Sequence, residues 1–249
     1  MQFAAASHVG LVRKVNQDGY LILSEQGKDY LVCVADGMGG HVAGEVASAL
    51  ALQTIREVMQ QGVENDQETR LQQAILSANQ RVYEQSVQTE KYAGMGTTIV
   101  AALLERESIW LAHVGDSRAY LLRGDGELSQ LTEDHSLVNE LLRRGQIQPQ
   151  EAIRHPQRHL LTRALGTLPD VVVECRNLAW TTGDMFFICS DGLTTHVADE
   201  QLRSILSTAE DLQVKVDQLI QAALDNGGHD NVTVVAVLHD GRLEEEVMG

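Results

Sequence analysis

Short runs of β-branched and large aliphatic residues recur along the chain, and runs of this length and composition predict β-strands. The predicted strands are Tyr20–Leu23, Tyr30–Ala35, Thr97–Leu104, Ile109–Val114, Ala119–Leu122, Val171–Val173, Met185–Cys189 and Val232–Leu238.

Two longer stretches place apolar residues on one face at the helical period, which predicts amphipathic helices over Ala43–Gln60 and Glu68–Val87. Asp66 is a suitable N-cap for the second helix, because its carboxylate can accept hydrogen bonds from the first helical turn. Shorter helices are predicted at His135–Arg144, Asp199–Leu206 and Leu212–Leu224.

The order of these elements indicates the fold class, because strands follow one another in groups rather than alternating singly with helices. Such an order favours antiparallel sheets with helices on their outer faces over a doubly wound parallel sheet. We therefore expect an α+β fold, a four-layer α-β-β-α sandwich of two antiparallel sheets flanked by helices, with one irregular insert. A single domain is expected over 1–240, followed by an acidic tail over 241–249.

Composition narrows the functional classes. Of the 249 residues, 43% are hydrophobic and only 4% are aromatic, so aliphatic side chains must fill the core. No apolar run approaches the roughly 20 residues that span a bilayer, and the N-terminus does not resemble a signal peptide. We expect a cytoplasmic protein without a membrane partner. The cysteines lack metal-ligand spacing and are expected in the core.

The formal net charge of −16 makes nucleic acid a poor partner, since phosphate backbones attract basic surfaces. The acidity has two interpretations: it keeps the protein soluble, or some of the carboxylates gather around cations. The total charge alone is compatible with both.

Aspartates stand where predicted strands begin or end, with small residues beside them. They are Asp18, Asp36, Asp116, Asp191 and Asp230. Any one of them is typical of a turn, because Asp bonds to nearby backbone and a following Gly accepts a positive φ. Five together suggest a second interpretation, since the ends of central strands can converge at one edge of a sandwich.

Converging carboxylates repel one another and are costly to bury unless a cation neutralises them. Carboxylates with a backbone carbonyl at Gly37 form a hard oxygen set that suits Mg²⁺ or Mn²⁺ rather than Zn²⁺. Two such ions about 3.5–4 Å apart can bridge a water and lower its pKa, so that it attacks phosphorus in line. The sequence has no G-x-S-x-G elbow and no P-loop, in keeping with a reaction that needs no protein nucleophile.

These residues lie in segments that resemble the PPM, or type 2C, family of metal-dependent protein phosphatases, especially its compact bacterial members. The matching segments, in the family's order, are Gly10–Arg13, Asn16–Asp18, Val34–Gly40, Gly94–Thr98, His113–Arg118, Leu131–Ser136, Cys189–Leu193 and Asp230–Thr233. They cover nearly the whole chain, and eight motifs in order are a specific signal where one would be weak.

The resemblance implies a binuclear metal centre. Asp36 would bridge both metals, and the Gly37 carbonyl would bind the first. Asp18, Asp191 and Asp230 would complete the centre, mainly through the second metal and through bound waters.

Four further implications follow from the resemblance. Asp116, with Asp191, would hold a third cation. Arg13 would grip the substrate phosphate, because a guanidinium presents a planar fork to phosphate oxygens. Asn231 would support the metal ligands from behind. The stretch at about 135–168 would form the family's flap beside the site.

One position departs from many eukaryotic members, which have His where this chain has Met38. That His is proposed as the general acid, and Met cannot donate a proton. His41 is a candidate substitute; a metal-bound water would serve equally well, and His41 is then a surface or supporting residue.

The expected function is therefore hydrolysis of phosphoserine and phosphothreonine in phosphorylated proteins, opposite a bacterial-type serine/threonine kinase. One alternative is a phosphatase of small phosphoesters or of another phosphorylated side chain, and the shape of the flap and of the rim near Arg13 would decide between these substrates. Another is a pseudophosphatase that binds phosphoproteins without turnover. The resemblance also implies a monomer.

Overall fold

The structure, a computed structural model, describes residues 1–25, 29–40, 42–61, 66–152 and 154–241. Its strands are β1 (Gln2–His8), β2 (Asp18–Glu25), β3 (Asp29–Met38), β4 (Gly96–Thr97), β5 (Ile99–Leu104), β6 (Ser108–Val114), β7 (Arg118–Leu122), β8 (Leu128–Gln130), β9 (Glu174–Ala179), β10 (Met185–Cys189) and β11 (Val232–Leu238). Its α-helices are α1 (Ala43–Gln61), α2 (Gln67–Gln88), α3 (Leu137–Arg143), α4 (Pro149–Ala152), α5 (Asp191–Thr194), α6 (Asp199–Leu206) and α7 (Leu212–Asp225).

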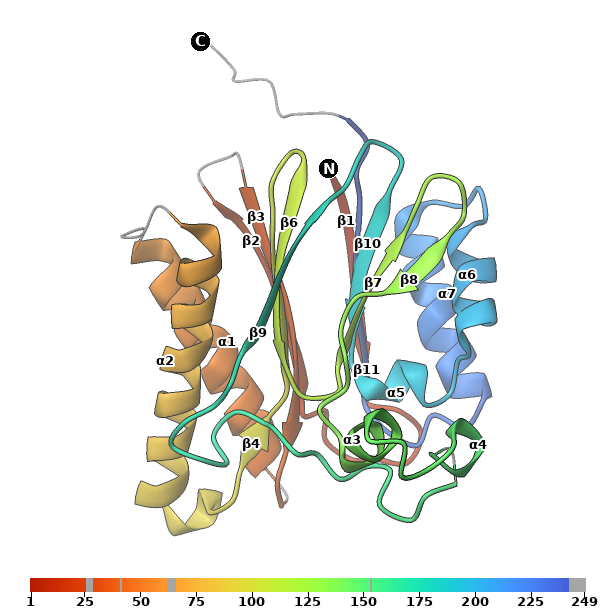
Figure 1. Cartoon of the computed structure of the whole chain (residues 1–249). Coiled ribbons are helices and arrows are strands. Elements are labelled where there is room, and N and C mark those ends of the chain that lie inside the picture. The colour runs from red at the N-terminus through yellow and green to blue at the C-terminus, as the bar shows by residue number, and fades with distance from the viewer. Residues whose placement is uncertain (26–28, 41, 62–65, 153, 242–249) are drawn as a thin grey trace.

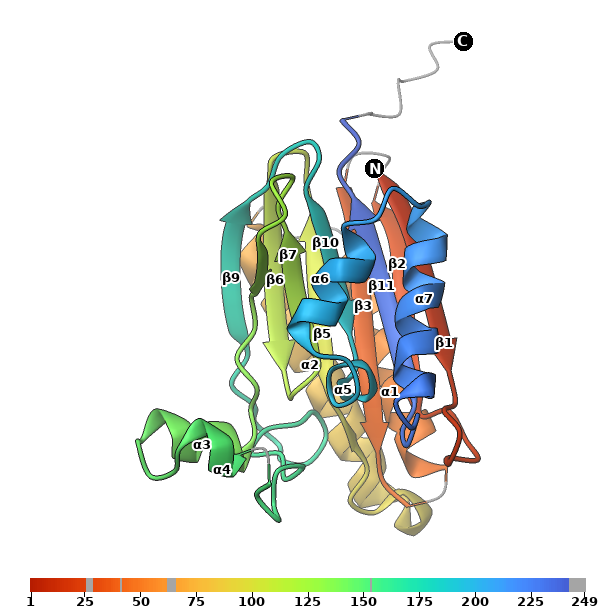
Figure 2. The same ribbon diagram turned by 90° about the vertical axis from the view of Figure 1, so that its right-hand side faces the viewer.

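The strands form two antiparallel sheets that lie face to face (Figure 1). One sheet has the order β1-β11-β10-β7-β8, and the other has the order β2-β3-β5-β6-β9, with β4 paired to β3. Helices α1 and α2 cover the outer face of the second sheet, and α6 and α7 cover the outer face of the first (Figures 1 and 2). The predicted four-layer α-β-β-α sandwich is confirmed.

The core has one apolar layer between the sheets and one beneath each helical layer. Strand β3 shows why its sequence is continuously apolar. Leu31 and Cys33 belong to the layer beneath α1 and α2, whereas Val32 and Val34 belong to the layer between the sheets. Since successive side chains of a strand point to opposite faces, a strand buried on both faces needs apolar residues at every position.

The long helices agree closely with the predicted ranges. In α2, the Asp66 carboxylate accepts a hydrogen bond from the backbone N–H of Thr69, at 3.0 Å, which confirms the predicted N-cap. Helix α3 begins two residues after the predicted start, because Ser136 takes the cap position and accepts from the Asn139 N–H.

The strand predictions need correction in two respects. Strands β1, β8 and β9 have no counterpart among the predicted strands. The predicted strand Val171–Val173 is wrong, since these residues precede β9 without regular structure. Within the described ranges, no helix combines the length and the apolar character that crossing a membrane requires. The domain limits, 1–240 with a tail over 241–249, stay predictions.

Candidate metal centre and its cavity

Strand pairing brings the first two aspartates together. In the antiparallel pair β2·β3, Asp18 lies directly opposite Asp36. The backbone of Asp36 is held from the other side by Thr98, whose hydroxyl accepts from the Asp36 N–H at 3.0 Å and whose N–H donates to the Asp36 carbonyl at 2.8 Å. The register of one hairpin therefore places two carboxylates at one end of the sandwich.

The other sheet brings two more aspartates to the same end. Asp191 follows β10 and opens the short helix α5, and Asp230 precedes β11, the antiparallel neighbour of β10. Asp116 follows β6. The charges of Asp18, Asp191, Asp116 and Asp230 all act on Asp36, so the five predicted residues form one cluster.

Both oxygens of the Asp18 carboxylate face protein groups. Its Oδ2 accepts hydrogen bonds from the hydroxyls of Ser190, at 2.7 Å, and Thr233, at 2.8 Å. Its Oδ1 is buried and has no hydrogen-bond partner in the part of the chain that the structure describes. Burial first, and then the charges of Asp191 and Asp230, raise the pKa of Asp18 to about 7, although the hydrogen bonds from the two hydroxyls lower it.

The same two causes act on the other carboxyls. Burial first, and then the charge of Asp191, raise the pKa of Asp116 to about 8. Burial and the neighbouring aspartates also raise the pKa of Asp36, well above its ordinary value. For Asp191, burial and the charge of Asp230 raise the pKa, while a hydrogen bond with Asp36 lowers it. The protein alone therefore supplies too little positive charge for this cluster.

This arrangement fits divalent cations. A buried carboxylate oxygen without a donor, Oδ1 of Asp18, sits in a cluster of like charges, and hard oxygen donors of this kind are the ligands that Mg²⁺ and Mn²⁺ prefer. Gly37 follows Asp36 on β3 and lines the same cavity. A Cβ at Gly37 would lie 2.0 Å from the carbonyl oxygen of Gly44. Only glycine lets β3 and the first turn of α1 approach this closely.

Arg13 lies at the mouth of the cluster. Its Nη2 donates to Oδ2 of Asp230 at 2.8 Å, and 51% of its side chain is exposed. One edge of the guanidinium is thus anchored to a predicted metal ligand, while half of the side chain faces solvent, where a phosphate could reach it.

Asn231 holds the loop that carries Arg13. Its side-chain amide donates to the carbonyls of Val9, at 2.8 Å, and Val15, at 3.0 Å, while its Oδ1 accepts from the Gln17 N–H at 2.8 Å. The side chain is buried and fully used by this loop, so its contacts are with the backbone around Arg13 rather than with the carboxylates. Its predicted support of the metal ligands stays a prediction.

A cavity of about 650 Å³ opens over the cluster. The predicted residues that line it are Arg13, Asp36, Gly37, Asp116, Asp191 and Asp230, and Met38 lines it as well. Asp18 and Asn231 are not among the lining residues. His41 lies outside the described residues.

Sequence reasoning missed four other residues that line this cavity, which are Arg158, His159, His196 and His229. His196 and His229 are hydrogen-bonded to each other, with Nε2 and Nδ1 3.0 Å apart. A usable signal existed for the first two, because residues 154–159 read Arg-His-Pro-Gln-Arg-His, a basic cluster in an acidic chain.

Comparison with known proteins agrees with this site. Residues 7–235 match the model of the family described as protein phosphatase 2C. The chain is 40% identical over 232 residues to a serine/threonine phosphatase, stp, of Listeria innocua, and the match covers 92% of each protein.

Solved structures give the same result for the fold. The crystal structure of the Mycobacterium tuberculosis serine/threonine phosphatase PstP/Ppp has a TM-score of 0.86 and 40% identity, covering 96% of this chain and 98% of that one. The catalytic domain of PstP in complex with two manganese ions has a TM-score of 0.83 and 37% identity, covering 94% and 96%. This chain therefore belongs to the protein phosphatase 2C family.

Proposed function

We propose that this protein is a metal-dependent protein serine/threonine phosphatase, which hydrolyses phosphoserine and phosphothreonine in phosphorylated proteins. The observation that carries the proposal is the cluster of aspartates from two sheets, with Arg13 at its mouth, beneath a cavity of about 650 Å³. The names of the relatives, serine/threonine phosphatases of about the same length, support it.

Mg²⁺ or Mn²⁺ would be held by Asp18, Asp36, Asp191 and Asp230, with the Gly37 carbonyl. Two ions in the core centre are supported by the two manganese ions named for PstP. A third, held by Asp116 with Asp191, completes the proposal. When bound, the cations supply Lewis acidity, which neutralises phosphate charge and lowers the pKa of water.

The chain's own residues bind and orient the phosphoester. Arg13 offers the exposed part of its guanidinium to two phosphate oxygens, while its bond to Asp230 fixes the direction of the fork. Water attacks phosphorus opposite the seryl or threonyl oxygen, a new P–O bond forms as the old one breaks, and the leaving oxygen takes up a proton. His41 is the proposed donor of that proton.

Arg158 and His159 line the same cavity. These side chains lie in the proposed flap, 135–168, where a phosphorylated protein would make contacts that a small phosphoester is too short to reach. Two finer parts of the proposal, a monomer and action opposite a serine/threonine kinase, rest on the family resemblance. The cytoplasmic location is the expectation drawn from the sequence.

The test is phosphate release from a phosphothreonine peptide, from a phosphorylated protein and from p-nitrophenyl phosphate, with Mn²⁺ or Mg²⁺ and then with EDTA. We expect release that needs metal, with the highest kcat/KM for the phosphorylated protein. Asp36→Asn should abolish it, while Asp125→Asn, in the exposed β7–β8 turn, is the matched control. Equal kcat/KM on all three substrates would favour the small-phosphoester alternative, and no release with either metal would favour a pseudophosphatase.

A further inference from the structure

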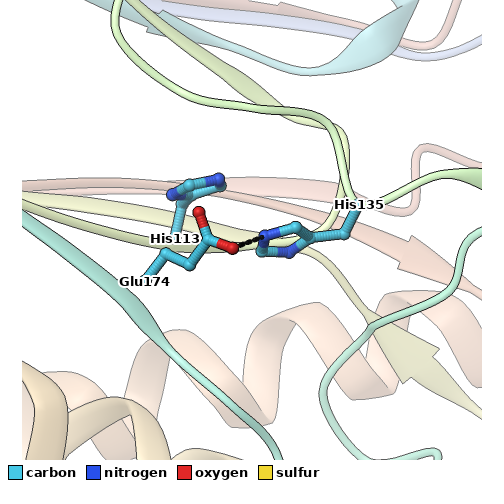
Figure 3. A group of neighbouring side chains, drawn as sticks. All are labelled: His113, His135 and Glu174. Carbon is cyan, nitrogen blue, oxygen red and sulfur yellow. Dashed lines mark ion pairs between the residues drawn. The ribbon is translucent and has the colours of Figure 1, made fainter. Parts of the chain in front are cut away.

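His113, His135 and Glu174 form a second cluster of ionisable groups, outside the aspartate centre. His113 lies on β6, His135 precedes α3, and Glu174 begins β9. Each offers a ligand-type atom within 4.8 Å of the others. Figure 3 shows the Glu174 carboxylate directed at the His135 ring, and these two groups are 3.0 Å apart. The two imidazole rings are stacked, with centroids 4.7 Å apart.

The geometry argues against a metal ion at this cluster. The Arg163 guanidinium already provides a positive charge there, with Nη1 2.9 Å from Glu174 Oε1 and 3.3 Å from His135 Nε2. A cation bound between these side chains would have to displace it. The negative charge of Glu174 is therefore already balanced by the Arg163 side chain.

The tautomer of His135 leads to the same conclusion. Its Nδ1 accepts a hydrogen bond from the Gly115 N–H at 3.1 Å, so Nδ1 carries no proton. Nε2 must then carry the proton and donate it to Glu174. Burial lowers the pKa of His135, which keeps the ring neutral at neutral pH, as this arrangement requires. Neither ring nitrogen has a lone pair left for a metal.

The same hydrogen bonds make His135 a clamp on Gly115. The backbone N–H of His135 donates to the Gly115 carbonyl at 2.9 Å, while its ring accepts from the Gly115 N–H. The N–H and the carbonyl of Gly115 are thus both hydrogen-bonded to His135. Gly115 is followed directly by Asp116, which lines the cavity, so the clamp fixes the backbone from which Asp116 projects.

His135, the first residue of the proposed flap, also contacts the flap's far end. Its carbonyl accepts from the Thr162 N–H at 2.9 Å, and the adjoining Ser136 forms an isolated bridge with Leu161. The next flap residue along, Arg163, shares Glu174 Oε1 with the His135 ring. His135 therefore joins three segments through its backbone and ring: the end of β6, the far end of the flap and the start of β9.

We propose that His135 is a positioning residue, whose ring, oriented by Glu174 and Arg163, fixes the Gly115–Asp116 backbone so that Asp116 is placed for cation binding. The inference rests on the proposed function, because it takes Asp116 as a cation ligand. Residues that orient metal ligands without touching the metal commonly alter metal affinity about 10–100-fold when changed.

Two substitutions test the hydrogen bonds of the two ring nitrogens separately. His135→Asn puts an amide oxygen near the position of Nδ1, so it can still accept from Gly115, but it is too short to reach Glu174. His135→Gln reaches toward Glu174 and leaves the Gly115 N–H without its acceptor. Both variants keep the backbone hydrogen bonds of residue 135, and thermal unfolding of each shows whether the fold is retained.

The first measurement is the rate of amide hydrogen exchange at Gly115, monitored by NMR on the full chain. We expect exchange about fivefold faster in His135→Gln, the loss of one net hydrogen bond, with His135→Asn close to the wild type. Equal exchange rates in the two variants would overturn the proposed clamp.

The second measurement is Mn²⁺ binding by calorimetry, with Asp116→Ala defining the binding that depends on Asp116. We expect His135→Gln to weaken this part about tenfold and to have no further effect in the Asp116→Ala background. Fast exchange at Gly115 with unchanged Mn²⁺ binding would overturn the positioning role, as would an unchanged Mn²⁺ titration in Asp116→Ala itself. Phosphate release by the wild type judges the proposed function separately.

Discussion

Replacing Asp18 by asparagine should stabilise the metal-free protein above neutral pH, although it removes a buried charged residue. The pKa of Asp18 is about 7 in the folded chain against 3.8 for the free side chain. Because the folded-state pKa is raised, the folded chain holds a proton that the unfolded chain has already lost. Stability is therefore complete below about pH 4 and falls as the pH rises through about 7.

The size of this effect follows from the two pKa values. One pKa unit corresponds to about 1.4 kcal/mol, so the change at Asp18 amounts to roughly 4 kcal/mol. The asparagine oxygen can still accept from Ser190 and Thr233, but its NH₂ group replaces an oxygen that has no partner among the described residues. An unsatisfied buried donor costs about 1–3 kcal/mol, which leaves a net gain of about 1–3 kcal/mol above neutral pH.

The assay is urea unfolding with EDTA at about pH 5 and about pH 8, repeated at pH 8 with saturating Mn²⁺. Without metal, Asp18→Asn should be the more stable protein at pH 8. With Mn²⁺ the order should reverse, because the wild type gains more binding energy. A metal-free wild type with equal stability at both pH values would refute the reasoning, as would a variant that is less stable than the wild type at pH 8.

Asp184 provides the matched control. It is also buried, but its carboxylate accepts from the N–H groups of Thr181 and Gly124 and from Arg123. Although burial raises its pKa, these hydrogen bonds lower it overall. Its contribution to stability is therefore present above the unfolded-state pKa and is lost as the pH falls. Asp184→Asn should destabilise the protein at pH 8 with or without Mn²⁺.

Three further predictions address the site. Asp36→Ala should weaken Mn²⁺ binding and reduce phosphate release at least about a hundredfold; near-normal kinetics would contradict the metal assignment. Arg13→Lys should raise the KM for a phosphothreonine peptide by about tenfold or more, with a smaller change in Mn²⁺ affinity by calorimetry; equal losses of both would contradict phosphate binding. Gly115→Ala should lower the free energy of unfolding in urea by about 2 kcal/mol or more, because its φ is +113° and a Cβ would lie 2.6 Å from the Thr98 side chain; unchanged stability would contradict it.

The sequence predicted the layers well because the buried strands and long helices carry strong local signals. Strand β3 is apolar at successive positions, and α2 has both a regular apolar face and a side-chain cap at Asp66. The aspartates were predictable for a related reason. Once the strand ends are known, pairing such as that of Asp18 with Asp36 brings them together.

What the sequence did not indicate lies where local signals are weak or misleading. Strand β1 is rich in alanine and polar residues and is defined by pairing with β11, which lies more than 200 residues away in the chain. The apolar residues Val171–Val173 looked like a strand, whereas β9 begins at the charged residue Glu174. Likewise, the clamp of His135 on Gly115 depends on a long-range contact that no spacing in the sequence reveals.

Both sheets contribute to the aspartate cluster, and the hydrogen bonds to Asp18 cross between them. Asp18 belongs to β2 of one sheet, whereas Thr233 belongs to β11 of the other, and their side chains are 2.8 Å apart. A slip of one sheet over the other by a single residue would displace these groups by about 3.3 Å, more than a metal–oxygen bond. If these aspartates bind cations as proposed, cation affinity depends on how the two sheets are aligned. We then expect substitutions in the apolar layer between the sheets to alter that affinity without touching a ligand.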